Sequence, residues 1–151
     1  MAASHTVTSQ DNFPAAAIRH FHDAEILKNA NSHENALCHY AFSVECAQKT
    51  LLYWRNRGNA HGHDLDTRWN DKTQSLVEAW ATLDGSVSAA LPTGGIPTKL
   101  NEEHPHRRYY KSFPCSQQEL DDCQHFAEKM QQTIICMMID GLITDKGGYE
   151  P

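Results

Sequence analysis

A stripe of apolar residues near the carboxyl end, spaced for one face of a helix, most constrains what this chain can fold into. Its members recur three or four positions apart over about five turns: Leu120, Cys123, Ala127, Met130, Ile134 and Met137. Ser116 and Glu119 precede them at the spacing of a capping box, in which each side chain bonds a free backbone N–H of the first turn. The pattern predicts a long helix with one face in a hydrophobic core.

Three further segments show helical spacing. A second stripe begins after a capping-box pair, Asn31 and Glu34, ends near Trp54, and consists of Leu37, Tyr40, Val44, Ala47 and Leu51. A first helix is predicted over about residues 13–29, and a third within residues 65–83, with one face formed by Leu65, Trp69, Leu76, Trp80 and Leu83. No segment sustains the period-two alternation of strands. The sequence therefore predicts an all-α, antiparallel bundle of four to five helices.

The bundle is predicted to span residues 13–145, between a flexible lead at 1–12 and a flexible tail at 146–151, with a long loop at 92–115. The chain has 151 residues and a net charge of −6, which excludes a protein that coats nucleic acid by overall charge. No signal peptide is seen and no apolar run could span a bilayer, so we expect a soluble, cytoplasmic protein without membrane partners. Five cysteines without a Cys-x-x-Cys pair indicate reduced thiols.

One dense cluster of basic and aromatic residues stands out in this acidic chain: His104, His106, Arg107, Arg108, Tyr109, Tyr110 and Lys111. Arginine offers a planar fork of donors to a phosphate, and tyrosine offers a face on which a base can stack. The cluster therefore predicts contacts with RNA or a nucleotide. The alternative is a loop whose tyrosines plug the end of the bundle while its cations stay solvated.

A second candidate site lies after the second predicted helix. His61 and His63 can move protons near neutral pH, and a carboxylate such as Asp64 can orient a histidine. Alternatively, Asp64 or Asp66 caps the third helix and His63 packs at its start, and for Asp64 this structural role is the favoured interpretation. Arg19, Asp23 and Glu45 are predicted to lie where the first two helices approach each other. They could point into a polar cleft, but solvated side chains or ion pairs between these helices are the favoured interpretation.

Metal ligands of the usual pattern are missing from the sequence. Structural zinc sites favour paired Cys-x-x-Cys or helical His-x-x-x-His spacing, and neither is present. We therefore predict no metal ion and no other cofactor.

Four pieces of the sequence, in this order, resemble the HEPN family. They are the Asp-Ala-Glu helix within residues 19–25, the Glu-Cys-Ala-Gln-Lys string within 40–52, the His-Asp-Leu at 63–65, and Arg-Tyr-Tyr at 108–110 followed by Phe113 and Pro114. The resemblance covers roughly residues 14–142. It implies a four- or five-helix bundle, usually a homodimer, with a polar cleft often shared between protomers.

HEPN members include metal-independent endoribonucleases, toxins paired with minimal nucleotidyltransferase antitoxins, and non-catalytic ligand-binding or adaptor proteins. The ribonucleases carry an arginine followed, after four to six residues, by a histidine. Arg55 with His61 and Arg57 with His63 match this spacing, so the resemblance makes these four the catalytic candidates. They follow the second helix, however, whereas the nucleases place the motif in or near a late helix.

Two functions therefore stay open. The first is a HEPN-type RNA- or nucleotide-binding protein of a prokaryotic toxin–antitoxin or defence system, with or without endoribonuclease activity. The second is a non-catalytic helical adaptor that dimerises or docks on a larger partner complex.

Overall fold

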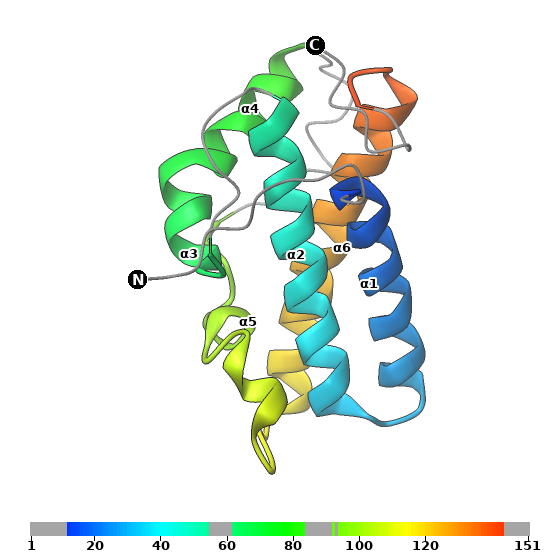
Figure 1. Cartoon of the computed structure of the whole chain (residues 1–151), viewed down its shortest axis with the longest axis vertical. Coiled ribbons are helices and arrows are strands. Elements are labelled where there is room, and N and C mark those ends of the chain that lie inside the picture. The colour runs from blue at the N-terminus through cyan, green and yellow to red at the C-terminus, as the bar shows by residue number, and fades with distance from the viewer. Residues whose placement is uncertain (1–11, 55–61, 84–91, 93, 144–151) are drawn as a thin grey trace.

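The computed structural model describes residues 12–54, 62–83, 92 and 94–143, and all regular structure within these ranges is helical. The predicted all-α class is confirmed. Three long helices, α1, α2 and α6, are accompanied by the shorter α3, α4 and α5 (Figure 1). Their bounds are Phe13–Asn29 (α1), His33–Trp54 (α2), Leu65–Arg68 (α3), Gln74–Leu83 (α4), Thr98–Asn101 (α5) and Gln117–Ile139 (α6). None of these described helices combines the length and the apolar character needed to cross a membrane.

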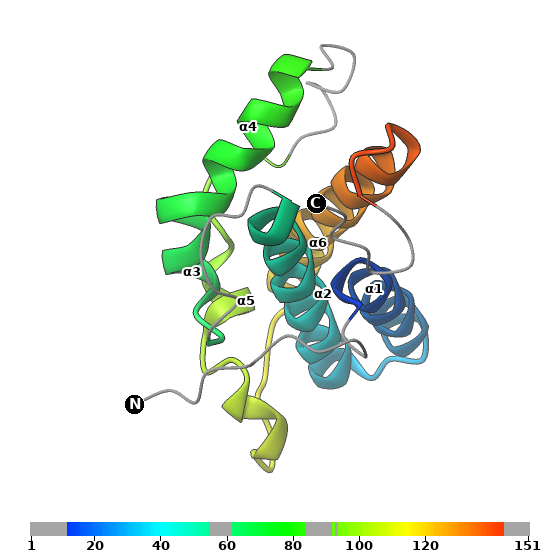
Figure 2. The same ribbon diagram turned by 45° about the horizontal axis from the view of Figure 1, so that its top comes forward.

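Helix α2 lies at the centre of the bundle. It packs against α1 on one side and against α3 and α4 on the other, and α6 covers a further face (Figures 1 and 2). Residues 43–52 of α2 are consequently all buried, on every side of the helix. Five of them are polar or charged, so each must find a hydrogen-bond partner inside the protein.

The predicted limits of the long helices depend on their capping residues. The Asn12 side chain accepts a hydrogen bond from the backbone N–H of Ala15 and begins α1. Ser116 and Glu119 form the predicted capping box of α6. All six residues of the apolar stripe on α6 are buried, as its spacing predicts.

Asn31 does not cap the second helix, the role predicted for it from the sequence, but ends the first. Its φ is 62°, and its N–H bonds the carbonyl of Lys28 while the N–H of Ser32 bonds that of Leu27. This pair of bonds is a Schellman motif, which closes α1 with a left-handed residue, a conformation that asparagine tolerates. Helix α2 therefore begins at His33, one residue later than a cap at Asn31 would place its first residue.

The third predicted helix is interrupted by a π-helical turn, Trp69–Thr73, in which the N–H of Gln74 bonds the carbonyl of Trp69 five residues back. Leu65, Trp69 and Leu76 are buried as predicted, whereas the side chains of Trp80 and Leu83 lie outside the described residues. Thr73 is also buried, and its hydroxyl donates to the Arg68 carbonyl at 3.2 Å.

The predicted loop at 92–115 contains regular structure. Helix α5 and a 3₁₀ turn, His106–Tyr109, lie within it, and α5 packs against both α2 and α6. The segment is thus an ordered arm along the bundle rather than a simple connection.

We expect Met130→Ala to lower the free energy of unfolding by about 2–5 kcal/mol, because Met130 is fully buried at the core face of α6 and its truncation leaves a cavity. Urea denaturation followed by circular dichroism measures the change. Gln132→Ala, on the exposed side of the same helix, is the control and should change stability by less than about 0.5 kcal/mol. Equal effects of the two substitutions would contradict the packing of α6.

Candidate functional site

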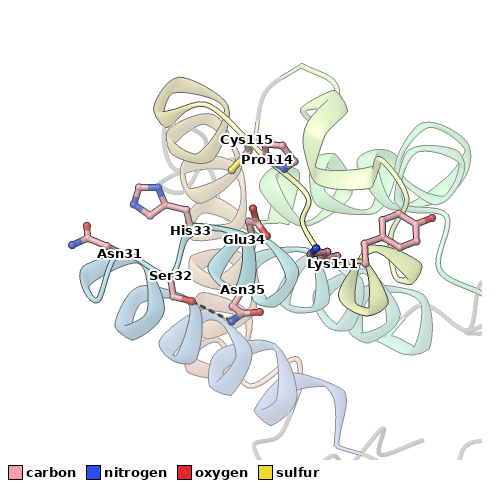
Figure 3. Close-up of a pocket in the computed structure, with 9 residues that line it drawn as sticks. Asn31, Ser32, His33, Glu34, Asn35, Lys111, Pro114 and Cys115 are labelled. Carbon is pink, nitrogen blue, oxygen red and sulfur yellow. Dashed lines mark hydrogen bonds between the residues drawn. The ribbon is translucent and has the colours of Figure 1, made fainter.

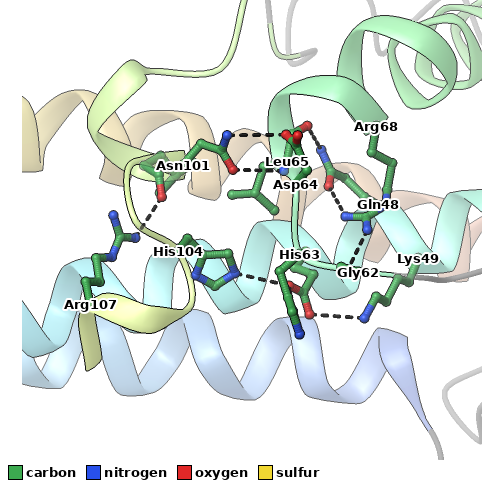
Figure 4. Close-up of polar contacts among 12 residues, drawn as sticks. Gln48, Lys49, Gly62, His63, Asp64, Leu65, Arg68, Asn101, His104 and Arg107 are labelled. Atoms are coloured by element: carbon green, nitrogen blue, oxygen red, sulfur yellow. Dashed lines mark hydrogen bonds and ion pairs between the residues drawn. The ribbon is translucent and has the colours of Figure 1, made fainter. Parts of the chain in front are cut away.

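The candidate site is built around a buried carboxylate, that of Glu45 on α2, whose exposed fraction is 4%. Its Oε1 accepts hydrogen bonds from His63 Nδ1 at 2.6 Å and from His104 Nε2 at 3.1 Å, and its Oε2 accepts one from Lys49 Nζ at 3.1 Å. His63, His104 and Lys49 come from three different parts of the chain (Figure 4). A charge removed from water is tolerated only with such partners.

The partners determine the protonation of the group. Burial by itself would raise the pKa of Glu45, but the hydrogen bonds from His104 and His63 and the charge of Lys49 outweigh it and hold that pKa well below its usual range. Burial lowers the pKa of His104 and outweighs the Glu45 carboxylate, which raises it, and the charge of Arg107 adds to the lowering. Near pH 7, Glu45 is therefore a carboxylate and His104 is a neutral ring that donates its Nε2–H.

His63 is the solvent-facing member of the cluster, with 48% of its side chain exposed. Because Nδ1 donates to Glu45, the neutral ring carries its lone pair on Nε2. Within the described residues Nε2 has no hydrogen-bond partner. A histidine that is oriented by a carboxylate and presents its second nitrogen to solvent is the arrangement of a general base.

Buried polar residues hold the segment that carries His63. Arg68 donates to the carbonyl of Gly62 at 2.8 Å and to the Gln48 side chain at 2.9 Å, and Gln48 donates to the carbonyl of Leu65 at 3.0 Å. Asp64 accepts from the backbone N–H of Thr67 at 3.1 Å, which confirms the prediction that it caps the third helix. These bonds tie residues 62–68, and with them the backbone of His63, to α2 (Figure 4).

Arg107 holds the arm that carries His104 in place by hydrogen bonds to the backbone of that arm. Its exposed fraction is 3%, and its guanidinium donates to the carbonyls of Lys99, Leu100 and Glu102 at 2.6, 2.7 and 2.9 Å. The side chain predicted to contact RNA is therefore buried, with both terminal guanidinium nitrogens bonded inside the protein.

Arg108, the next residue, lies on the surface. Its guanidinium is 5.4 Å from the centre of the Phe42 ring and 4.8 Å from that of Tyr109, and it donates to the Tyr109 hydroxyl at 2.8 Å. Phe42 also contacts His104 edge-on, with ring centres 4.8 Å apart. Arg108 and Tyr109 are therefore placed beside the Glu45 cluster, one ring away from it.

Tyr110 and Lys111 line a different feature, an open pocket of about 540 Å³ between the arm and the turn that joins α1 to α2 (Figure 3). The Tyr110 hydroxyl donates to Glu103 at 2.8 Å. The predicted basic–aromatic cluster is thus divided among three places. Arg107 is in the interior, Arg108 and Tyr109 lie beside the Glu45 cluster, and Tyr110 and Lys111 line this pocket.

Other sequence-based assignments have mixed outcomes. Arg55, Arg57 and His61 lie outside the described residues.

The interpretation of Glu45 as solvated or paired between the first two helices is wrong, because its partners are Lys49 of its own helix and two histidines from loops. The signal that could have found this site is a Glu-x-x-x-Lys pair within a helical run that is otherwise suited to the core.

Glu45, His63 and His104 have the donor types of a metal site, and their ligand atoms lie within 4.8 Å of one another. In this cluster, however, Oε1 already accepts from both histidines and Oε2 pairs with the ammonium of Lys49. A cation would displace these bonds and meet the charge of Lys49. The arrangement therefore favours proton transfer over metal binding.

Comparisons of the chain with protein families, with curated proteins and with solved structures find no match.

We expect Glu45→Gln to lower the free energy of unfolding by about 3 kcal/mol near neutral pH, because it leaves the buried Lys49 ammonium without its counter-charge. The pKa of Glu45 is lower in the folded than in the unfolded chain, so its contribution is fully present above about pH 4.3 and is lost as the pH falls further. The stability difference between wild type and variant, from urea denaturation, should narrow below that pH. A constant difference would mean that Glu45 is not ionised in the folded protein.

Proposed function

We propose that the chain is a HEPN-type RNA-binding protein that cleaves RNA without a metal ion, with His63 as the general base. One observation carries the proposal. Glu45, His63 and Arg108 belong to three of the four separate sequence pieces that resemble the family, and all three lie around His104 and Phe42. The pieces are far apart in the sequence, so their convergence is what a shared site requires.

The proposed chemistry follows from the free nitrogen of His63. Nε2 takes the proton of a ribose 2′-hydroxyl, whose oxygen attacks the adjacent phosphorus. The bond from phosphorus to the 5′-oxygen breaks, and the leaving 5′-oxygen takes up a proton from solvent while His63 releases its own. The products are a 2′,3′-cyclic phosphate and a free 5′-hydroxyl, and no metal ion takes part. Glu45 keeps the His63 ring in the tautomer that this step needs.

Substrate contacts are assigned to the exposed residues of the arm. Arg108 supplies a charge to the phosphate, and the Tyr109 ring, which is 74% exposed, supplies a face for a base. A homodimer, a nucleotidyltransferase-type antitoxin and a defence setting are part of this proposal through the resemblance alone.

A non-catalytic adaptor is the second candidate function. It is supported by Ile139, the last residue of α6, and by Leu142 in the turn that follows, whose exposed fractions are 78% and 36%. Apolar side chains exposed in this way are suited to a docking partner. An adaptor requires neither His63 nor Arg108, so the same variants separate the two functions.

His63→Ala should slow RNA cleavage by about 100-fold or more and leave binding nearly unchanged, because His63 moves a proton and does not hold the phosphate. The assay uses labelled RNA in EDTA, with analysis of the cut ends. His106→Ala removes another exposed histidine of the same arm and is the control. Cleavage by His63→Ala at the wild-type rate would reject His63 as the base.

Arg108→Ala should weaken RNA binding by about 10- to 100-fold and reduce its salt dependence, because a charge-assisted contact to phosphate is lost. Fluorescence anisotropy at several salt concentrations measures both effects. Lys111→Ala removes one charge at the pocket beside the turn between α1 and α2, away from the Glu45 cluster, and should have a smaller effect. If the wild-type protein binds no RNA at low salt, the proposed function is wrong and the adaptor remains.

A further inference from the structure

A second pair of histidines lies outside the Glu45 cluster, where α1 packs against α2. His20 of α1 and His39 of α2 direct their Nδ1 atoms at each other at a distance of 3.1 Å, with ring centres 5.3 Å apart. Both side chains are half-buried, so they are ordered by packing and still reachable from solvent.

Asp23 adds a carboxylate to this pair. It follows His20 by three residues, which places both on the same face of α1. Its ligand oxygen and the two ring nitrogens all lie within 4.8 Å of one another. Among the described residues, the Asp23 carboxylate forms no hydrogen bond and no ion pair. Three donor atoms therefore converge, and one of them is an anionic oxygen without a partner in that part of the chain.

We propose that His20, Asp23 and His39 bind a zinc-type divalent ion and leave its fourth position open. Zinc binds histidine nitrogen at about 2.0–2.1 Å, so two nitrogens of a tetrahedral site lie about 3.3–3.4 Å apart. The observed 3.1 Å differs from that separation by only a few tenths of an ångström. Two histidines, one carboxylate and one open position form a donor set that zinc uses.

The contrast with the Glu45 cluster supports this assignment. There, one carboxylate is saturated by two ring N–H groups and by the ammonium of Lys49. At the second cluster no ammonium from the described part of the chain pairs with the carboxylate, and the neighbouring cation, Arg19, is exposed to solvent. The ligand atoms of His20, Asp23 and His39 face one another. The one hydrogen bond among them is between the two rings, so a single proton would have to leave for an ion to bind.

The proposed ion would bridge the first two helices next to the candidate site. The His20 ring lies 5.5 Å from Phe42, the same ring that contacts His104. Because an ion that binds only the folded chain stabilises it by mass action, zinc should raise the melting temperature of the protein. The site does not depend on RNA cleavage, and it departs from the sequence-based expectation that no metal is bound.

The test is titration of the metal-free, full-length protein with Zn²⁺ by calorimetry and with Co²⁺ by visible absorption. We expect one ion per chain, the intense bands of four-coordinate Co²⁺, and a higher melting temperature with Zn²⁺. His39→Ala and Asp23→Asn should each weaken Zn²⁺ binding by more than about tenfold, since even partners outside the ligand shell change affinity by about 10- to 100-fold.

Three controls make the result decisive. His22→Ala removes an exposed histidine of α1 and should leave binding unchanged. His63→Ala should also leave it unchanged, which distinguishes this site from the Glu45 cluster. His39→Gln keeps a polar side chain between the helices, so it separates loss of a ligand from loss of folding when the metal-free variants are compared by circular dichroism.

The proposal is overturned if wild-type protein does not bind Zn²⁺, in which case the two rings share only a hydrogen bond. It is also overturned if folded His39→Gln and Asp23→Asn bind Zn²⁺ like the wild type, or if His63→Ala alone abolishes binding. The RNA assay in EDTA is read separately, so either proposal can fail without the other.

Discussion

The rest of the structure depends on one buried charge, the carboxylate of Glu45. It lies in the stretch of α2 that is covered on all sides, where an unpaired charge would not be tolerated. Its partners come from the same helix, from the segment before α3 and from the arm after α5. Breaking a buried pair of this kind costs about 3–5 kcal/mol. The two segments that bring His63 and His104 are therefore held against α2 by the need to satisfy this group.

Buried arginines complete the arrangement. Arg68 directs its guanidinium group at the carbonyl of Gly62 in the loop before α3, and Arg107 directs its own at carbonyls of the short helix α5. The planar fork of donors suits this use, since one side chain can satisfy several carbonyls at once. Arg107 and Arg108 also show how neighbours can differ. They are adjacent in a 3₁₀ turn, yet one is an internal anchor and the other is a surface cation beside Phe42.

Two clusters of histidine and carboxylate flank the Phe42 ring, and their surroundings give them different chemistry. Around Glu45, protons and an ammonium occupy the carboxylate, and a single histidine nitrogen is presented to solvent. Around Asp23, the described residues leave the carboxylate oxygens without partners and bring two ring nitrogens together. The same residue types are thus suited to proton transfer in one place and to metal binding in the other.

The sequence by itself determined the three long helices, because their signals are local. The stripe of α6, its Ser116–Glu119 capping box and the Asp64 cap each depend on residues a few positions apart. Only the tertiary structure decided the site. His63 and His104 are 18 and 59 positions from Glu45, and no local pattern reports contacts at that distance. The burial of Arg107 is hidden from the sequence for the same reason, since a cation's charge is visible in a sequence but the carbonyls that bind it are not. Burial and pairing of polar groups are properties of the packed bundle, and these decided which of the charged residues face solvent.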